Sequence, residues 1–190
     1  MKATIVVEGK SDLAIIRALL PPDLLAACQF KASEGRSTLV SVARTHLIKH
    51  HAPTAVMLDT DTLDPTVIRE TIQMTRHLIG TVAGKTAFDI IYCIPHLEAV
   101  FFEAPVDLQR IFPKFKSVYI LQFAKTQPKG QLDLLLKEGG GPRKLSEFLD
   151  QLTSEDAAKL RLTYPIEHLM TFIKNNLDLA STKPANTFQP

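Results

Sequence analysis

The stretch that most constrains the fold of this chain is Ala55–Asp64, A-V-M-L-D-T-D-T-L-D, in which a short apolar run leads straight into acidic residues. An apolar run of this length that ends in polar residues is typical of a strand buried in a parallel sheet. In open α/β sheets, functional sites form outside the carboxyl ends of the strands. The stretch therefore predicts an α/β fold with acidic residues at its functional edge.

Asp59 and Asp61 are two residues apart, so on an extended chain their side chains project to the same side. Carboxylates held this close repel each other unless a cation lies between them. Mg²⁺ is the expected cation because it prefers hard oxygen ligands and keeps several waters. Solvated loop residues are the alternative for this pair, and Asp64 before Pro65 is predicted to cap the next helix.

The N-terminus supplies a second acidic strand end. Ala3–Val7 is a β-branched run followed by Glu8 and Gly9, and a helix is predicted over Asp12–Leu20, stopped by Pro21. Glu8 is thus expected at the same sheet edge as Asp59 and Asp61. A solvated turn for Glu8, and a charged helix start for Lys10 and Asp12, are the alternatives.

Further strands are predicted over residues 26–32 and 87–94, with Glu98 shortly after the last strand. Between the second and third strands, Ser37 is predicted to cap a helix over Thr38–His50. Arg36, in the turn before it, is a candidate phosphate contact, although an ordinary capped turn is the slightly favoured interpretation. Glu98 is either a further acid at the functional edge or a helix-start acid.

Two other expectations concern the helices around the third strand. Gly80 is predicted to end a helix that begins at Pro65. His46, His50 and His51 are expected at the surface and not as metal ligands.

Composition excludes several classes of protein. The net charge of +2 is too small to indicate a chain that is basic over its whole surface, as many nucleic-acid-binding domains are, so any basic surface is local. The two cysteines lack C-x-x-C spacing, which argues against a zinc site or a disulfide framework. The apolar runs are shorter than the roughly 18–20 residues of a membrane span, and Glu8 interrupts any signal-peptide core. We expect a soluble, cytoplasmic protein.

Taken together, V-V-E-G-K-S-D at residues 6–12 and L-D-T-D at residues 58–61 resemble the Toprim domain of topoisomerases, bacterial primases and the overcoming-lysogenisation-defect (OLD) nucleases. The resemblance implies a Rossmann-like, mostly parallel four-stranded sheet flanked by helices. It also implies a Toprim core over residues 1–103. The helical periodicity beyond the core predicts a mostly helical extension over 104–180, and the lack of periodicity at the end predicts a flexible tail over 181–190. The stretch C-I-P-H-L-E-A-V-F-F looks most like the small standalone nucleases of the OLD branch.

In that branch, the resemblance implies a nuclease dependent on Mg²⁺ or Mn²⁺, with one or two ions. The metal ligands would be acidic residues: Glu8, Asp12, Asp59, Asp61 and Glu98. Glu8, Asp59 and Asp61 would also be catalytic, with Glu8 as a ligand or a general base and Lys129 as an assisting lysine. Lys10, Arg36, Arg143 and Lys144 are candidate phosphate contacts.

The expected partner is nucleic acid, DNA more than RNA, and not a membrane. The chain lacks a G-x-x-x-x-G-K-[ST] motif, so an ATPase partner in phage defence would be a separate chain. A homodimer is also an option. Three other functions stay open: a non-catalytic docking subunit, a specialised ribonuclease, and a phosphatase or phosphotransferase built on the same acidic Mg²⁺ cluster.

Overall fold

The computed structural model describes residues 2–104, 106–115 and 122–181, and for 178–181 it describes the backbone alone. The predicted tail over 181–190 therefore lies, apart from Ser181, outside the described residues. Within the described part of the chain, no helix is long and apolar enough to cross a membrane.

Four parallel strands form one sheet in the order β2-β1-β3-β4. The strands are β1 (Ala3–Val7), β2 (Cys28–Ala32), β3 (Thr54–Asp59) and β4 (Phe88–Cys93). The two central strands, β1 and β3, are buried along their whole length, as their mostly apolar sequences predict. The predicted parallel α/β sheet is confirmed.

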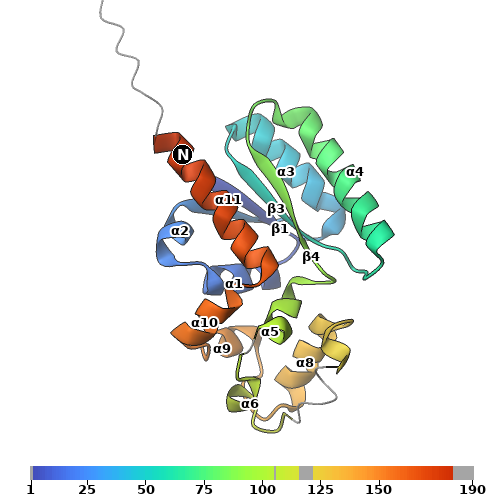
Figure 1. The fold of residues 1–190 in the computed structure, drawn as a ribbon, viewed down its shortest axis with the longest axis vertical. Helices are drawn as coiled ribbons and strands as arrows, with labels where there is room; N and C mark the ends of the chain where they lie inside the picture. The colour runs from blue at the N-terminus through green and yellow to red at the C-terminus, as the bar shows by residue number, and fades with distance from the viewer. Residues whose placement is uncertain (1, 105, 116–121, 182–190) are drawn as a thin grey trace, which may run out of the picture.

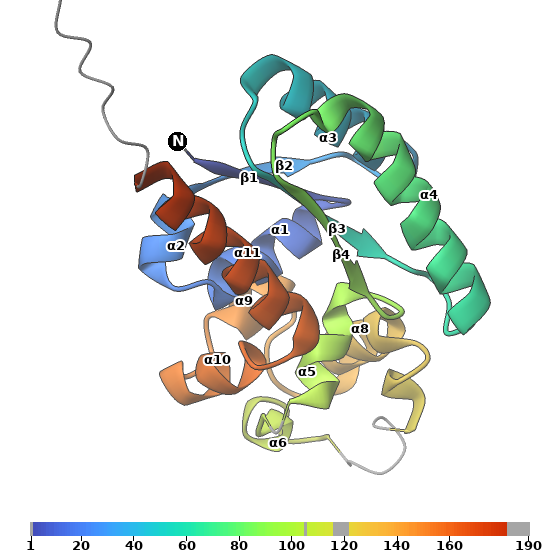
Figure 2. The same ribbon diagram turned by 45° about the horizontal axis from the view of Figure 1, so that its top comes forward.

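Side chains alternate between two apolar layers because successive residues of a strand point to opposite faces. Val6, Val56 and Ile90 face α3 (Arg36–His50) and α4 (Pro65–Ala83). The other face, which carries Ile5 and Met57, packs in one cluster with α1 (Lys10–Leu19), α2 (Pro22–Ala26) and α11 (Tyr164–Ser181). Figures 1 and 2 show α3 and α4 on one side of the sheet and α1, α2 and α11 on the other.

Short helices lie beyond the carboxyl end of the sheet (Figure 1). Their bounds are η1 (Leu97–Ala99), α5 (Val100–Glu103), α6 (Leu108–Ile111), α8 (Pro128–Glu138), α9 (Leu145–Leu149) and α10 (Ser154–Leu160). The ring of Phe148 lies 4.9 Å from that of Phe101 and 5.5 Å from that of Phe112, and all three belong to the same apolar cluster as Ile5. The apolar core is therefore continuous from the sheet into these helices. The proposed division at residue 103 stays a prediction.

Local predictions had mixed outcomes. Asp64 caps α4 as predicted, because its Oδ1 accepts hydrogen bonds from the N–H groups of Thr66 (2.8 Å) and Val67 (3.4 Å). The predicted Ser37 cap is wrong: α3 begins at Arg36, and Gly35 occupies the cap position with a φ of +127°, which favours glycine.

Two further expectations are corrected. Gly80 does not end α4, which continues to Ala83, and Gly80 lies against the ring of Phe88. His46 is buried and not at the surface; its ring lies 4.7 Å from that of His50, and burial lowers its pKa. Both errors arise from tertiary packing that the local sequence does not reveal.

Candidate metal and catalytic site

The carboxyl ends of β1, β3 and β4 meet at one edge of the sheet and bring acidic residues with them. Glu8 follows β1 directly, Asp59 is the last residue of β3, and Glu98 lies in η1 shortly after β4. Backbone hydrogen bonds from Thr60 to Cys93 and from Asp61 to Pro95, both 3.0 Å, tie the loop after β3 to the loop after β4. The predicted convergence of these acids is therefore built into the sheet topology.

Among the carboxyl groups described at this edge, Asp59 has the most strongly raised pKa. It is buried, and its Oδ1 accepts a hydrogen bond of 3.0 Å from the Leu97 N–H. Burial raises its pKa to about 8, and the negative charges of Asp12, Glu98 and Glu8 add to the effect. Asp59 therefore lies within the electrostatic field of three other predicted metal ligands.

Glu8 and Glu98 each hold a buried oxygen that lacks a partner. Among the described residues, Glu8 Oε1 and Glu98 Oε2 have no hydrogen-bond donor. Burial raises the pKa of both groups; the charge of Asp61 adds to the effect on Glu8, and that of Asp12 on Glu98. Leaving a buried acceptor unsatisfied is costly, so these oxygens are suited to a bound cation.

Asp12 has a clear structural role. Its Oδ2 accepts a hydrogen bond of 2.8 Å from the Gly9 N–H, so it caps the first turn of α1 while buried beside the other acids. The capping alternative is therefore observed. Its role as a metal ligand stays a prediction.

Asp61 is half exposed and is held by an arginine and a histidine side chain. Arg36 Nη1 lies 2.5 Å from its Oδ2, and His96 Nε2 lies 3.1 Å from its Oδ1. Arg36, a predicted phosphate contact, thus lies at the acidic edge. His96 was not among the predicted site residues, although it lies, like Glu98, just past a strand end and could have been found by the same argument.

The other predicted cations differ in their placement. Lys129 lies in the first turn of α8, and its charge lowers the pKa of Glu98, so the structure brings this pair together. Lys10 is exposed at the start of α1, and Arg143 and Lys144 are exposed ahead of α9. Among the described residues, no hydrogen bond or ion pair connects these last three side chains to the carboxylates.

The donor set fits a hard divalent cation in its chemistry, because it consists of carboxylate oxygens and two of them lack partners. Its geometry is incomplete: across the described ranges, no three His, Cys, Asp or Glu side chains converge into a ready ligand set. Binding an ion therefore requires side chains to turn toward it, and Asp61 would exchange Arg36 for the ion.

Comparison with known proteins identifies the fold. No protein-family model and no curated protein matches the sequence. Among solved structures, the C-terminal region of the Xanthomonas campestris pv. campestris OLD protein superposes with a TM-score of 0.51 at 16% identity, over 95% of this chain and 98% of that one. The corresponding region of the Burkholderia pseudomallei OLD protein gives a TM-score of 0.49 at 14% identity, over 90% and 98% of the two chains. The chain thus has the Toprim-like α/β fold that its motifs predicted, and its resemblance to OLD proteins is confirmed at the level of fold.

Proposed function

We propose that this chain is a Toprim-type nuclease that hydrolyses phosphodiester bonds in nucleic acid, DNA more than RNA, with Mg²⁺ or Mn²⁺. The observation that carries the proposal is the pair of buried, unpartnered carboxylate oxygens of Glu8 and Glu98 beside Asp59. Carboxyl groups whose pKa is raised this strongly by burial and by neighbouring negative charges are typical of functional sites. A soluble fold gains nothing from leaving such oxygens unsatisfied, whereas a cation would satisfy them.

In this proposal Glu8, Asp59 and Asp61 hold one ion, and Glu98, with Asp12, lies near a second. When bound, the ions lower the pKa of the attacking water and neutralise charge that develops on the phosphate. Burial raises the pKa of Glu8, which makes its carboxylate a stronger proton acceptor, so Glu8 could instead act as the general base for that water. The water oxygen forms a bond to phosphorus as the bond to the leaving sugar oxygen breaks.

The basic residues at this edge of the sheet are proposed to contact the phosphate groups of the nucleic acid. Lys129, which acts electrostatically on Glu98, is placed to stabilise negative charge on the phosphate. Arg36, once Asp61 turns to the ion, is free to form a charge-assisted hydrogen bond with a phosphate oxygen. Lys10, Arg143 and Lys144 are proposed as outer phosphate contacts. The resemblance to OLD nucleases extends the proposal to a cytoplasmic antiviral effector that acts with a separate ATPase chain, as a monomer or a homodimer.

A non-catalytic docking subunit is the second candidate. One observation favours it: in the described residues no ready ligand set is formed, and Asp61 is already paired with Arg36 and His96. Such a module would keep the Toprim fold and the perturbed acids but would not cut nucleic acid.

Cleavage assays with matched variants separate the two candidates. Supercoiled plasmid, single-stranded DNA and structured RNA are incubated with the protein in Mg²⁺, in Mn²⁺ or in EDTA. We expect metal-dependent cleavage that Asp59→Asn and Glu98→Gln abolish and that Asp133→Asn, an exposed acid on α8, leaves unchanged. Preferential cleavage of RNA would identify a ribonuclease.

Two results would contradict the proposal. Equal cleavage by wild type, Asp59→Asn and Glu98→Gln would show that these carboxylates are not the site. Metal binding by the wild type without cleavage of any of the substrates would favour the docking module.

A further inference from the structure

Two cavities adjoin along the segment that follows β4. The first has a volume of about 220 Å³ and lies between Tyr92 and Tyr164, and the second has a volume of about 690 Å³. Both are lined by Ile94, Ala99 and Glu103, so they lie against the same segment, and the two together are here called the β4 groove. The size of the larger cavity is within the range of sites for small organic groups.

The walls of the β4 groove are apolar and aromatic, with a few polar groups. At the far end lie Leu63, Phe102 and Lys125. Leu63 is 46% exposed and Ile94 is 37% exposed, so part of the apolar wall is accessible to a ligand from solvent. Lys125 is the cationic side chain among the described lining residues of this end.

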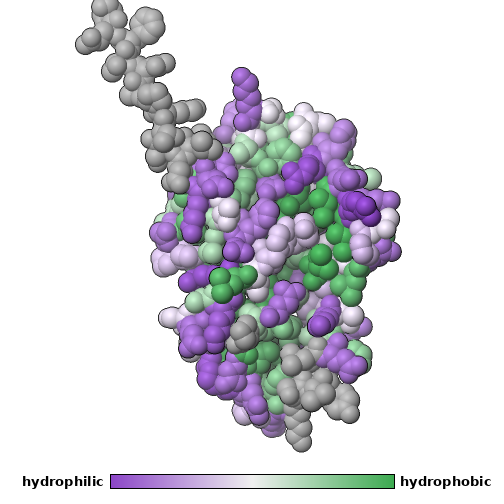
Figure 3. All heavy atoms as spheres, viewed as in Figure 1, coloured by the Kyte–Doolittle hydropathy of each residue, from purple (hydrophilic) through white to green (hydrophobic). Residues whose placement is uncertain are grey.

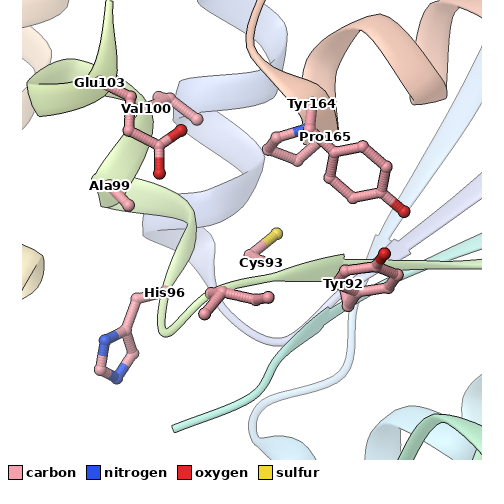
Figure 4. Close-up of a pocket in the computed structure, with 9 residues that line it drawn as sticks. Tyr92, Cys93, His96, Ala99, Val100, Glu103, Tyr164 and Pro165 are labelled. Carbon is pink, nitrogen blue, oxygen red and sulfur yellow. The ribbon is translucent and has the colours of Figure 1, made fainter. Parts of the chain in front are cut away.

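Figure 4 shows the narrower end of the groove. The carboxylate of Glu103 and the Sγ of Cys93 point into the space below Tyr164 and Pro165, and the hydroxyl groups of the two tyrosines approach each other. The rings of Tyr92 and Tyr164 lie 4.8 Å apart at their centroids. Partial burial of its carboxyl group raises the pKa of Glu103.

The groove and the carboxylate cluster lie on two sides of one segment. His96 lines the narrower end of the groove with its ring pointing away from the two tyrosines (Figure 4), and its Nε2 lies 3.1 Å from Asp61 Oδ1. Ala99 lines the groove, while its neighbour Glu98 belongs to the cluster. Leu63, at the other end of the groove, is two residues after Asp61. A phosphate at the cluster therefore has the groove next to it.

We propose that the β4 groove binds an unpaired nucleobase of the strand whose phosphate lies at the carboxylate cluster, which makes single-stranded or frayed nucleic acid the preferred substrate. The proposal rests on the nuclease function proposed above. It assigns a base-binding role to Tyr164, Leu63 and Glu103.

The chemistry of the groove fits a base better than a sugar or a peptide. Proteins hold an unpaired base by stacking it on aromatic or apolar side chains and by hydrogen bonds to its polar edge. Tyr164, 40% exposed, offers a ring face, and the Glu103 carboxyl offers the hydrogen bonds. The positive charge of Lys125 is complementary to the negative charge of the adjacent phosphate. A base inside a duplex is stacked and paired, so it cannot enter the groove without opening.

Binding of two matched strands tests the proposal. Fluorescence anisotropy measures the affinity of labelled oligothymidylate, and of a strand of the same length whose sugars carry no bases, with Ca²⁺ in place of Mg²⁺. We expect the base-containing strand to bind about tenfold more tightly, the size of a base-stacking contribution. Tyr164→Leu and Leu63→Ser should reduce this difference, whereas Tyr164→Phe, which keeps the ring, should preserve most of it.

The control is Leu162→Ser, because Leu162 is equally apolar, 73% exposed and not among the groove residues. Equal affinity of wild type for the two strands, or an equal effect of Leu63→Ser and Leu162→Ser, would overturn the base site. If the protein still cleaves nucleic acid in that case, the proposed function stands and only the base site fails. If it binds neither strand and cuts nothing, both proposals fail.

Discussion

Replacing Asp59 by asparagine should stabilise the protein when no metal is present. Burial and the neighbouring acids raise the pKa of Asp59 from 3.8 to about 8. Between these values the folded state holds a proton that the unfolded chain has released, so stability falls as the pH rises. The loss is about 1.4 kcal/mol for each pH unit, which amounts to about 4 kcal/mol at pH 7.

The asparagine substitution removes this penalty without removing the hydrogen bond. Its side-chain oxygen still accepts from the Leu97 N–H, which lies 3.0 Å from Asp59 Oδ1. Asp59→Asn should therefore raise the free energy of unfolding by about 4 kcal/mol at neutral pH, and by almost nothing below about pH 3, where the carboxyl group is protonated in both states. Mg²⁺ should stabilise the wild type and not the variant, because the ion binds the ionised carboxylates.

Urea denaturation followed by circular dichroism checks this, in EDTA, at about pH 5 and about pH 8. Asp133→Asn is the matched control, since this aspartate is exposed on α8 and its replacement should leave the pH dependence unchanged. The reasoning would be refuted if Asp59→Asn were less stable than wild type at pH 8. A wild-type stability that does not change between the two pH values would refute it equally.

Three further predictions concern the helices beyond the sheet and are checked by the same denaturation measurement. Gly139→Ala should destabilise the fold by about 1–3 kcal/mol, because an added Cβ would lie 2.5 Å from the Leu135 carbonyl oxygen. Gly130→Ala, in the open space on α8, should instead stabilise it by about 0.5–1 kcal/mol. Asp156→Ala should cost about 1–2 kcal/mol, since Asp156 completes the capping box of α10 and pairs with Arg110 at 2.6 Å; an unchanged stability would contradict the role of this cap.

Much of the site could be predicted because the sequence shows where the buried strands end. The apolar runs before Glu8 and Asp59 identified two parallel strands, and parallel strands present their carboxyl ends at one edge. Pro65 after Asp64 identified a helix start in the same way, through local backbone chemistry. These signals act over a few residues, so they needed no knowledge of the tertiary structure.

The remaining features depend on contacts between distant segments. Gly80 looked like a helix end but lies inside α4, against Phe88 of a neighbouring strand. The place of His96 just past a strand end could be read from the sequence, but its pairing with the distant Asp61 could not. The β4 groove has no sequence motif at all, since Leu63 and Tyr164 are far apart in the sequence. Their proximity follows only from how α11 and the loop after β3 pack around β4.

The central claim is that the acids at the carboxyl edge of the sheet hold the divalent cation on which cleavage depends. Titration calorimetry with Mn²⁺ tests it most directly, on wild type, Glu98→Gln and Asp133→Asn. The account predicts heat of binding for wild type and Asp133→Asn, and a large loss of affinity for Glu98→Gln, which removes the charge next to the unpartnered oxygen. No binding by the wild type, or equal binding by all three proteins, would contradict the account.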